Sequence, residues 1–78
     1  MRHPLKCWPE FFQAIVERKK TFEVRKNDRD FKVGDTLRLY EYDPKSKTYT
    51  GRVHTVEVTY IAPMDRFGMK GIVAMSIR

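Results

Sequence analysis

Apolar residues recur at helical spacing near the start of the chain. Such a stripe, with a repeat of three to four residues, is typical of a helix that buries one face. The residues of the stripe are Phe11, Phe12, Ile15 and Val16, preceded one turn earlier by Trp8. Pro9 suits a first helical turn, where its missing N–H would have no partner, and Glu10 complements the positive helix N-terminus. The pattern predicts a helix over residues 9–18.

The rest of the chain alternates between apolar and polar positions, as strands with one buried face do. Turn-forming residues separate the alternating segments. The segments predicted to be extended are residues 3–7, 21–26, 36–42, 49–61 and 72–77. One helix cannot cover both faces of such a sheet, so we expect the sheet to bend and close partly on itself. The predicted fold class is α+β, mainly β: a small open β-barrel of about five strands with one principal helix packed on it.

The alternation also predicts which side chains form the core. In residues 21–26, Phe22 and Val24 alternate with Glu23 and Arg25. We expect the apolar pair to face inward and the charged pair to face outward. The full predicted core is Leu5, Phe11, Phe12, Ile15, Phe22, Val24, Leu37, Leu39, Val56, Val58 and Ile77. A chain of 78 residues has room for one domain, residues 1–78, with one small core.

The positive charge of the chain is concentrated beside the predicted helix–strand junction. The formal net charge is +6 and the isoelectric point is about 9.7. Seven Lys or Arg and three acidic residues lie between positions 18 and 32, which places four of the six net charges there. Such a patch favours a phosphate-bearing partner, although it would also serve as a solvated loop. The expected partner is RNA or a nucleotide, bound with strong salt dependence.

Cysteine, histidine and the length of apolar segments limit the possible locations, partners and metal sites of the protein. Cys7 is the only cysteine, so an internal disulfide is excluded and a reducing cytoplasm is the expected location, with the thiol buried. No segment approaches the roughly 20 apolar residues of a membrane span, and no signal-peptide pattern is visible, so we expect no membrane partner. His3 and His54 are far apart, without Cys or carboxylate at ligand spacing. The sequence therefore predicts no metal site and no cofactor, and His3 is expected at the surface.

The basic stretch contains a spacing that resembles a known signature. Arg18-x-Lys20-x-x-Glu23-x-Arg25 is similar to Gly-x-Lys-x-x-Glu-x-Arg at a helix–strand junction of the ASCH domain, a PUA-like, RNA-associated superfamily. Further segments resemble, in the same order, a family of short single-domain ASCH-like proteins of bacteria and phages, a domain of unknown function. These segments are residues 5–10, 20–31, 33–35, 41–44, 49–52, 58–61 and 75–77. Arg18 and Lys47 stand where relatives carry glycine, so the backbone there is expected to be strained or different.

The resemblance implies a PUA-like barrel with a cleft between the helix and the barrel mouth, where RNA or a modified base would bind. The residue chemistry is compatible, because Glu23 between Lys20 and Arg25 can accept hydrogen bonds from a base edge. The same three side chains could instead only pair with one another. Trp8 and Tyr40 could stack on bases, although Trp8 also fits the core. The predicted RNA- or ligand-binding residues are Lys6, Trp8, Lys20, Glu23, Arg25, Lys26, Arg29 and Tyr40.

Two other functions stay open at this point. One ASCH branch hydrolyses the acetyl group of N4-acetylcytidine with a Lys, a Thr and a Glu near this junction. Lys20 matches the Lys, but Glu23 stands at the position of the Thr, and Thr21 lies two residues away, about 6–7 Å along a strand. We therefore expect no such amidohydrolase activity; in an enzyme, Lys20, Thr21 and Glu23 would be the catalytic candidates. A protein-interaction module, such as a phage or bacterial modulator of a host protein, is the third hypothesis.

Overall fold

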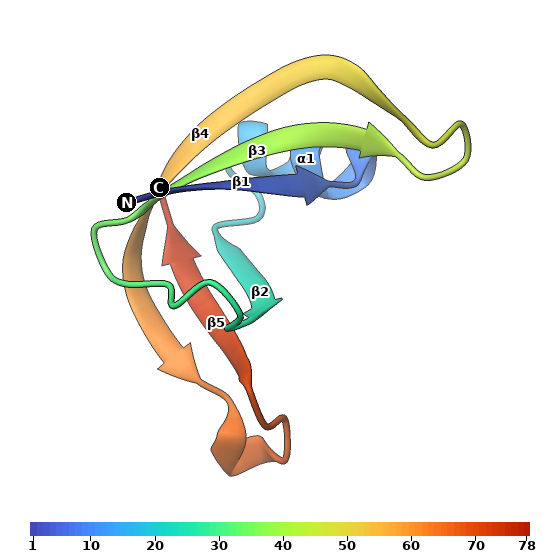
Figure 1. Ribbon diagram of the computed structural model, residues 1–78. Helices are drawn as coiled ribbons and strands as arrows, with labels where there is room; N and C mark the ends of the chain where they lie inside the picture. The colour runs from blue at the N-terminus through green and yellow to red at the C-terminus, as the bar shows by residue number, and fades with distance from the viewer.

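A computed structural model describes residues 1–78 as one bent sheet with one α-helix (Figure 1). The elements in chain order are β1 (Arg2–Cys7), α1 (Pro9–Val16), β2 (Phe22–Lys26), β3 (Thr36–Asp43), β4 (Thr48–Pro63), a 3-10 helix η1 (Asp65–Phe67) and β5 (Ile72–Ile77). The sheet order is β1-β3-β4-β5-β2, with β1 parallel to β3 and all other pairs antiparallel. The predicted α+β, mainly β class is confirmed. With eight residues, α1 is far too short to span a bilayer as a helix, and η1 is shorter still.

The long strand β4 joins the two halves of the sheet. Its first part pairs with β3, and its last part pairs with β5 after a register shift between Val58 and Tyr60. Such irregularities bend a strand, and in Figure 1 the ribbon of β4 arches from one half to the other. The outer strands β1 and β2 pair with one neighbour each and not with one another. The sheet therefore curls without closing into a barrel.

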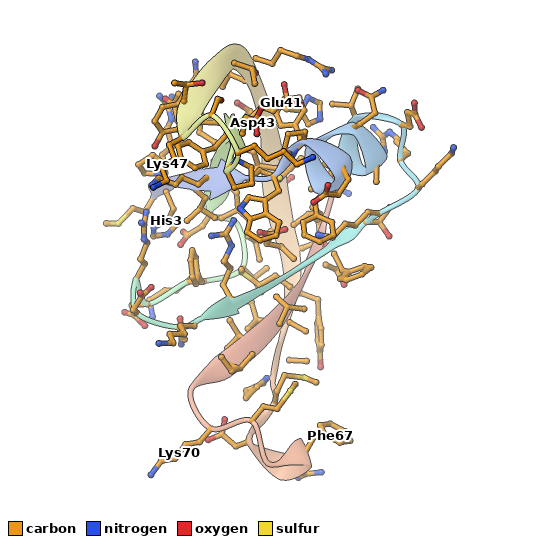
Figure 2. All side chains as sticks on the ribbon, turned by 90° about the vertical axis from the view of Figure 1, so that its right-hand side faces the viewer. His3, Glu41, Asp43, Lys47, Phe67 and Lys70 are labelled. Atoms are coloured by element: carbon orange, nitrogen blue, oxygen red, sulfur yellow. The ribbon has the colours of Figure 1, made fainter.

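The core lies inside this curl and matches most of the prediction. Eight predicted residues are buried: Leu5, Phe12, Ile15, Leu37, Leu39, Val56, Val58 and Ile77. Four others complete the cluster: Cys7, Phe31, Val73 and Met75. The burial expected for the Cys7 thiol is thus confirmed, whereas Phe11, Phe22 and Val24 are exposed and were predicted wrongly. The tip of the β4–β5 hairpin, with Phe67 and Lys70, projects away from the end that carries Glu41 and Lys47 (Figure 2).

The helix is shorter than predicted and ends through a left-handed residue. It stops at Val16, and Arg18 has a φ of 61°. The backbone N–H groups of Lys19 and Lys20 both donate to the carbonyl of Ala14, which satisfies the end of the helix. Arg18 thus adopts the conformation that glycine takes at low cost, as does Lys47 in the β3–β4 hairpin with a φ of 57°. Both positions were identified from the sequence as replacements of glycine.

Only a narrow strip of α1 meets the sheet. Phe12 and Ile15, three residues apart, are buried, whereas Phe11 on the adjacent face is not. Arg52 from β4 covers the helix: its guanidinium lies 4.8 Å from the centre of the Phe12 ring and donates to the Gln13 side chain. A helix of two turns offers room for few buried side chains, and this explains why Phe11 was placed wrongly in the core.

The inward and outward faces of β2 are the reverse of those predicted. Glu23 pairs with Met75 and Arg25 with Val73 on β5. Residues paired across an antiparallel ladder point to the same side of the sheet. Because Val73 and Met75 are buried core residues, the charged positions of β2 face inward and Phe22 and Val24 face outward. Alternation defined the two faces correctly, but pairing with β5 decided which of them is inside.

Two arginines bridge the open edge between β2 and β1. The Arg25 guanidinium donates to the carbonyl oxygen of Lys6, and the Arg29 guanidinium donates to the carbonyl oxygen of Pro4. These carbonyls belong to the edge of β1 that faces away from β3, where no further strand supplies N–H donors. Unpaired edge groups attract other strands unless they are covered. The arginines therefore satisfy the edge and hold the curl of the sheet together.

Candidate functional site

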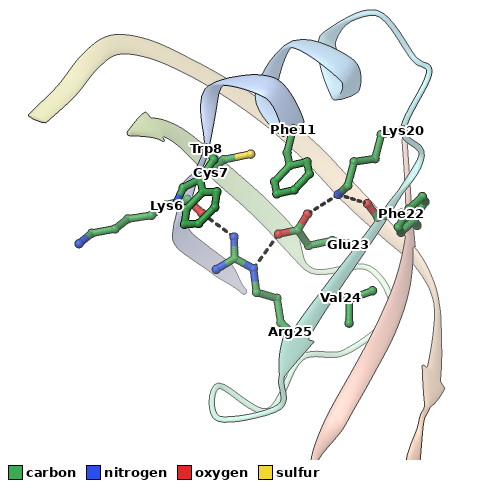
Figure 3. A pocket seen from close by; sticks show the side chains of 9 residues that line it. All are labelled: Lys6, Cys7, Trp8, Phe11, Lys20, Phe22, Glu23, Val24 and Arg25. Atoms are coloured by element: carbon green, nitrogen blue, oxygen red, sulfur yellow. Dashed lines mark hydrogen bonds and ion pairs between the residues drawn. The ribbon is translucent and has the colours of Figure 1, made fainter. Parts of the chain in front are cut away.

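A pocket of about 530 Å³ opens where β1 runs into α1 and faces β2. Side chains from three segments converge on it (Figure 3). The lining residues are Lys6, Cys7, Trp8, Phe11, Lys20, Phe22, Glu23, Val24 and Arg25. We call this hollow the junction pocket, because it lies at the predicted junction between helix and strand. Its wall is largely apolar, and its polar groups are concentrated around one carboxylate.

That carboxylate belongs to Glu23, which is 5% exposed. Lys20 Nζ donates to its Oε1 over 3.0 Å, and Arg25 Nε donates to its Oε2 over 2.6 Å. A buried carboxylate without partners would be costly, and the two ion pairs offset this cost. Each oxygen nevertheless has further lone-pair capacity. The two cations orient the carboxylate and leave it able to accept hydrogen bonds from a molecule in the pocket.

Lys20 is held in place by more than its ion pair. Its ammonium group donates to the backbone carbonyl of Phe22 over 2.7 Å and lies 4.7 Å from the Phe22 ring centre and 5.6 Å from the Phe11 ring centre. Contacts of this kind between a cation and ring faces are favourable. Lys20 is therefore a fixed structural cation at this junction and not a mobile surface lysine.

Aromatic rings form the rim of the junction pocket. The rings of Trp8 and Phe11 are nearly parallel, at 7° with centroids 6.3 Å apart, and are 49% and 47% exposed by residue. Phe22 lies across from them on β2 and is also exposed. Exposed aromatic faces beside a hollow are the usual platforms for planar ligands. The placement of Trp8 in the core, which the sequence also allowed, is therefore wrong.

Cys7 lines the wall of the junction pocket but is poorly suited to act as a nucleophile. Burial raises the pKa of its thiol to about 11, and the negative charge of Glu23 contributes in the same direction. Only a thiolate is an effective nucleophile, and a thiol of this pKa is almost entirely protonated at neutral pH. Cys7 consequently serves as a small apolar wall residue.

The structure gathers most of the predicted site residues but not all of them. Lys6, Trp8, Lys20, Glu23 and Arg25 line the junction pocket. Arg29 and Tyr40 line a neighbouring hollow, which also includes Lys6 and Arg25. Lys26 lines neither of them. Thr21, the possible nucleophile, lines a small separate hollow of about 70 Å³ on the other side of Lys20, together with Arg18 and His54.

Phe11, Phe22 and Val24 are site-lining residues that sequence reasoning missed. All three were assigned to the core because they are apolar and periodic. For Phe22 and Val24, a signal that could have placed them correctly is the alternation of Val73, Met75 and Ile77 on β5, whose side chains occupy the inner face of the sheet. The pairing of that strand with β2 leaves no inner position for Phe22 and Val24.

Another buried carboxylate, that of Asp35, lies away from all three hollows, and its contacts correct the placement of His3. His3 is buried, and its ring donates from Nε2 to Asp35 Oδ2 over 2.7 Å, since an ionised carboxylate can only accept. The Lys32 backbone N–H and the amino group of Met1 donate to the same carboxylate. The hydrogen bond from His3 is the main cause that lowers the pKa of Asp35 to about 2. His3 is thus a core residue, and its expected surface position is wrong.

Fold and pocket together define a small, mainly β domain with one helix and an aromatic pocket at the helix–strand junction. A family model described as "Domain of unknown function (DUF3850)" matches residues 2–77, and the chain belongs to this family. An uncharacterized 12.9 kDa protein in the GpA 3' region of Escherichia phage P2 is 34% identical over 63 residues, 81% of this chain and 56% of the relative. The chain thus spans about half the length of that phage protein. Neither match extends to the ASCH or PUA-like superfamily.

Proposed function

We propose that this protein is a small RNA-binding module of the PUA-like kind, and that the junction pocket holds one base. The observation that carries the proposal is the combination of half-exposed, nearly parallel rings of Trp8 and Phe11 with the oriented carboxylate of Glu23 in one hollow of about 530 Å³. The rings supply a stacking surface, and the carboxylate supplies a hydrogen-bond acceptor at the edge of that surface.

Stacking would provide most of the affinity. Alanine substitutions at aromatic stacking platforms in single-strand-binding proteins cost about 1–3 kcal/mol per base. Trp8, Phe11 and Phe22 offer such surfaces from two sides of the pocket. Unpaired bases of RNA are recognised in this way, because their faces and edges are accessible.

Glu23 would provide discrimination among bases. A carboxylate accepts hydrogen bonds and cannot donate them while it is ionised. A base that presents an amino or ring N–H group toward Glu23 would be favoured, and one that presents only carbonyl oxygens would be disfavoured. Lys20 and Arg25 support this role by fixing the carboxylate, since each is bonded to it and to a backbone carbonyl.

Phosphate contacts would then depend on the other cations. Lys6 and Arg29 lie along the edge of β1 next to the pocket, and Lys26 follows Arg25 on β2. These residues would make the binding dependent on salt. Hydrolysis of N4-acetylcytidine receives no support from a specific contact, because Thr21 lines a different hollow from Glu23; we expect no cytidine release above background.

Trp8 allows a direct test, because it is the only tryptophan in the chain. Its fluorescence should change saturably when short single-stranded RNA is added at low salt, and the affinity should fall steeply at higher salt. Glu23→Gln should weaken binding about tenfold, which corresponds to about 1.4 kcal/mol. Glu57→Gln is the matched control, since Glu57 lines none of the hollows and pairs only with Arg78, so its loss should leave binding unchanged. Absence of any fluorescence change with RNA at low salt would remove the proposal.

A further inference from the structure

A second hollow lies directly beside the junction pocket. Its volume is about 650 Å³, and it shares Lys6 and Arg25 with the junction pocket. The remaining lining residues are Pro4, Leu5, Arg29, Tyr40 and Tyr49. Five of the seven lining residues are thus cations or tyrosines, brought together from β1, β2, the segment after β2, β3 and β4. No acidic residue lines the hollow.

Three tyrosines cover the sheet next to this hollow. Tyr49 lies edge-on to Tyr42 with ring centroids 5.1 Å apart and edge-on to Tyr40 with centroids 6.3 Å apart. The three residues form what we call the tyrosine face. It points away from the core because Leu37, Leu39 and Glu41, which alternate with Tyr40 and Tyr42 on β3, are buried. Tyr49 is 55% exposed and presents the most accessible ring.

Cations lie at both ends of the tyrosine face. Lys6 Nζ is 4.5 Å from the Tyr42 ring centre, and Arg38 Nε donates to the Tyr40 hydroxyl over 3.0 Å. Arg25 and Arg29 meet the same surface from the β1 edge, where each donates to a backbone carbonyl. Accessible aromatic rings combined with a positive rim are the features by which proteins hold single-stranded nucleic acid.

We propose that the tyrosine face binds the nucleotide adjacent to the one in the junction pocket, on the same RNA strand. This inference rests on the proposed function. Both hollows are lined by Lys6 and Arg25. Lys6 would contact the phosphate that links the two nucleotides, while Arg25 holds the Glu23 carboxylate. One nucleotide therefore fills only the junction pocket, a ligand of two or more nucleotides fills both hollows, and Tyr49 contributes to binding only when the second nucleotide is present.

The test compares nucleoside 5'-monophosphates with trinucleotides in titrations followed by amide chemical shifts of the labelled protein. The trinucleotide should bind at least tenfold more tightly than the tightest monophosphate and should shift the signals of Tyr42 and Tyr49. Tyr49→Ala should abolish most of this gain and leave monophosphate binding unchanged, while Tyr49→Phe should retain the gain. Tyr60→Ala is the matched control, because Tyr60 is an exposed tyrosine of β4 that lines neither hollow.

The outcomes separate this inference from the function on which it rests. Equal affinities for monophosphate and trinucleotide would overturn the second subsite and leave the junction pocket in place. A gain that survives Tyr49→Ala, or an equal loss for both ligands, would also overturn it, because the variant would then act elsewhere or on the fold. Failure of both ligands to bind would overturn the proposed function itself.

Discussion

Glu23 and Asp35 are both buried carboxylates, and they differ in what surrounds their oxygen atoms. Asp35 receives hydrogen bonds from the His3 ring, the Lys32 backbone and the amino terminus, and it borders neither of the two hollows. Glu23 receives two hydrogen bonds, one from Lys20 and one from Arg25, and its carboxylate faces a hollow of about 530 Å³.

The difference separates a structural ion pair from a candidate binding group. The hydrogen bonds to Asp35 join the start of β1 to the turn before β3, so they hold the starts of these two parallel strands together. The network of Glu23 holds a charged acceptor at a place that solvent or a ligand can reach. Burial alone does not distinguish these two cases; the space next to the oxygen atoms does.

The largest expected effect is on stability, in a matched pair of isosteric substitutions. Asp35→Asn should lower the free energy of unfolding by about 2–3 kcal/mol, because the buried His3 ring and two partly buried donors lose a charged acceptor. Glu23→Gln should cost less than half as much, since the pocket admits water and both Lys20 and Arg25 keep a carbonyl partner. Urea denaturation measures both values. Equal losses for the two variants would show that the junction pocket is as closed as the Asp35 network.

Acid should remove the contribution of Asp35 in a defined range. The pKa of Asp35 is lowered from 3.8 to about 2 in the folded protein, with the hydrogen bond from His3 as the main cause. A lowered pKa stabilises the fold fully above the unfolded value, and this stabilisation disappears as the pH falls through the folded value. The difference in thermal midpoint between the wild type and Asp35→Asn should therefore shrink from pH 5 to pH 2. A difference that stays constant over this range would contradict the assignment.

The reactivity of Cys7 tests the surroundings of Glu23, because the Cys7 thiol lies in the wall of the junction pocket. With the pKa raised from 9.0 to about 11, the thiolate fraction at pH 8 falls about 100-fold. Native protein should therefore react with a disulfide reagent more than tenfold more slowly than protein unfolded in urea, because the buried thiol is less ionised and less accessible. Glu23→Gln removes one cause of the raised pKa and should increase the rate. Equal rates in the native and unfolded protein would mean that the thiol is exposed.

How far the sequence predicts this fold depends on whether a feature is local. The strands and the start of the helix follow from alternation and from Pro9, and the structure contains them near the expected bounds. The inward face of β2 could not be derived in this way, because it is decided by pairing with β5, about 50 residues further along the chain. The same limit explains the misplaced Phe22 and Val24.

In the candidate site too, contacts between residues close in sequence were predicted and contacts between distant segments were not. Lys20, Glu23 and Arg25 were recognised together because they are close in sequence, and they do meet in the structure. Tyr49 was not predicted, since its contacts with Tyr40 and Tyr42 depend on the register of the β3–β4 hairpin. His3 was placed at the surface because its partner Asp35 is 32 residues away. Contacts that join distant segments require the register of the sheet, which alternation does not provide.

The smallest expected effect is a gain in stability on replacing Arg18, which lies two residues before Lys20 of the junction pocket. Arg18 has a φ of 61°, and a left-handed conformation costs an L-residue about 1–2 kcal/mol. Arg18→Gly should relieve this cost, but glycine also gives the unfolded chain more freedom, worth about 0.4–1 kcal/mol. The net gain should be about 0.5–1 kcal/mol in urea denaturation, with unchanged RNA affinity, because Arg18 lies outside the junction pocket. Lys19→Gly, one position along at a residue without positive φ, should instead destabilise the protein. If both substitutions destabilise the protein equally, the helix does not end through a strained Arg18, and Lys20 must be positioned beside Glu23 in another way.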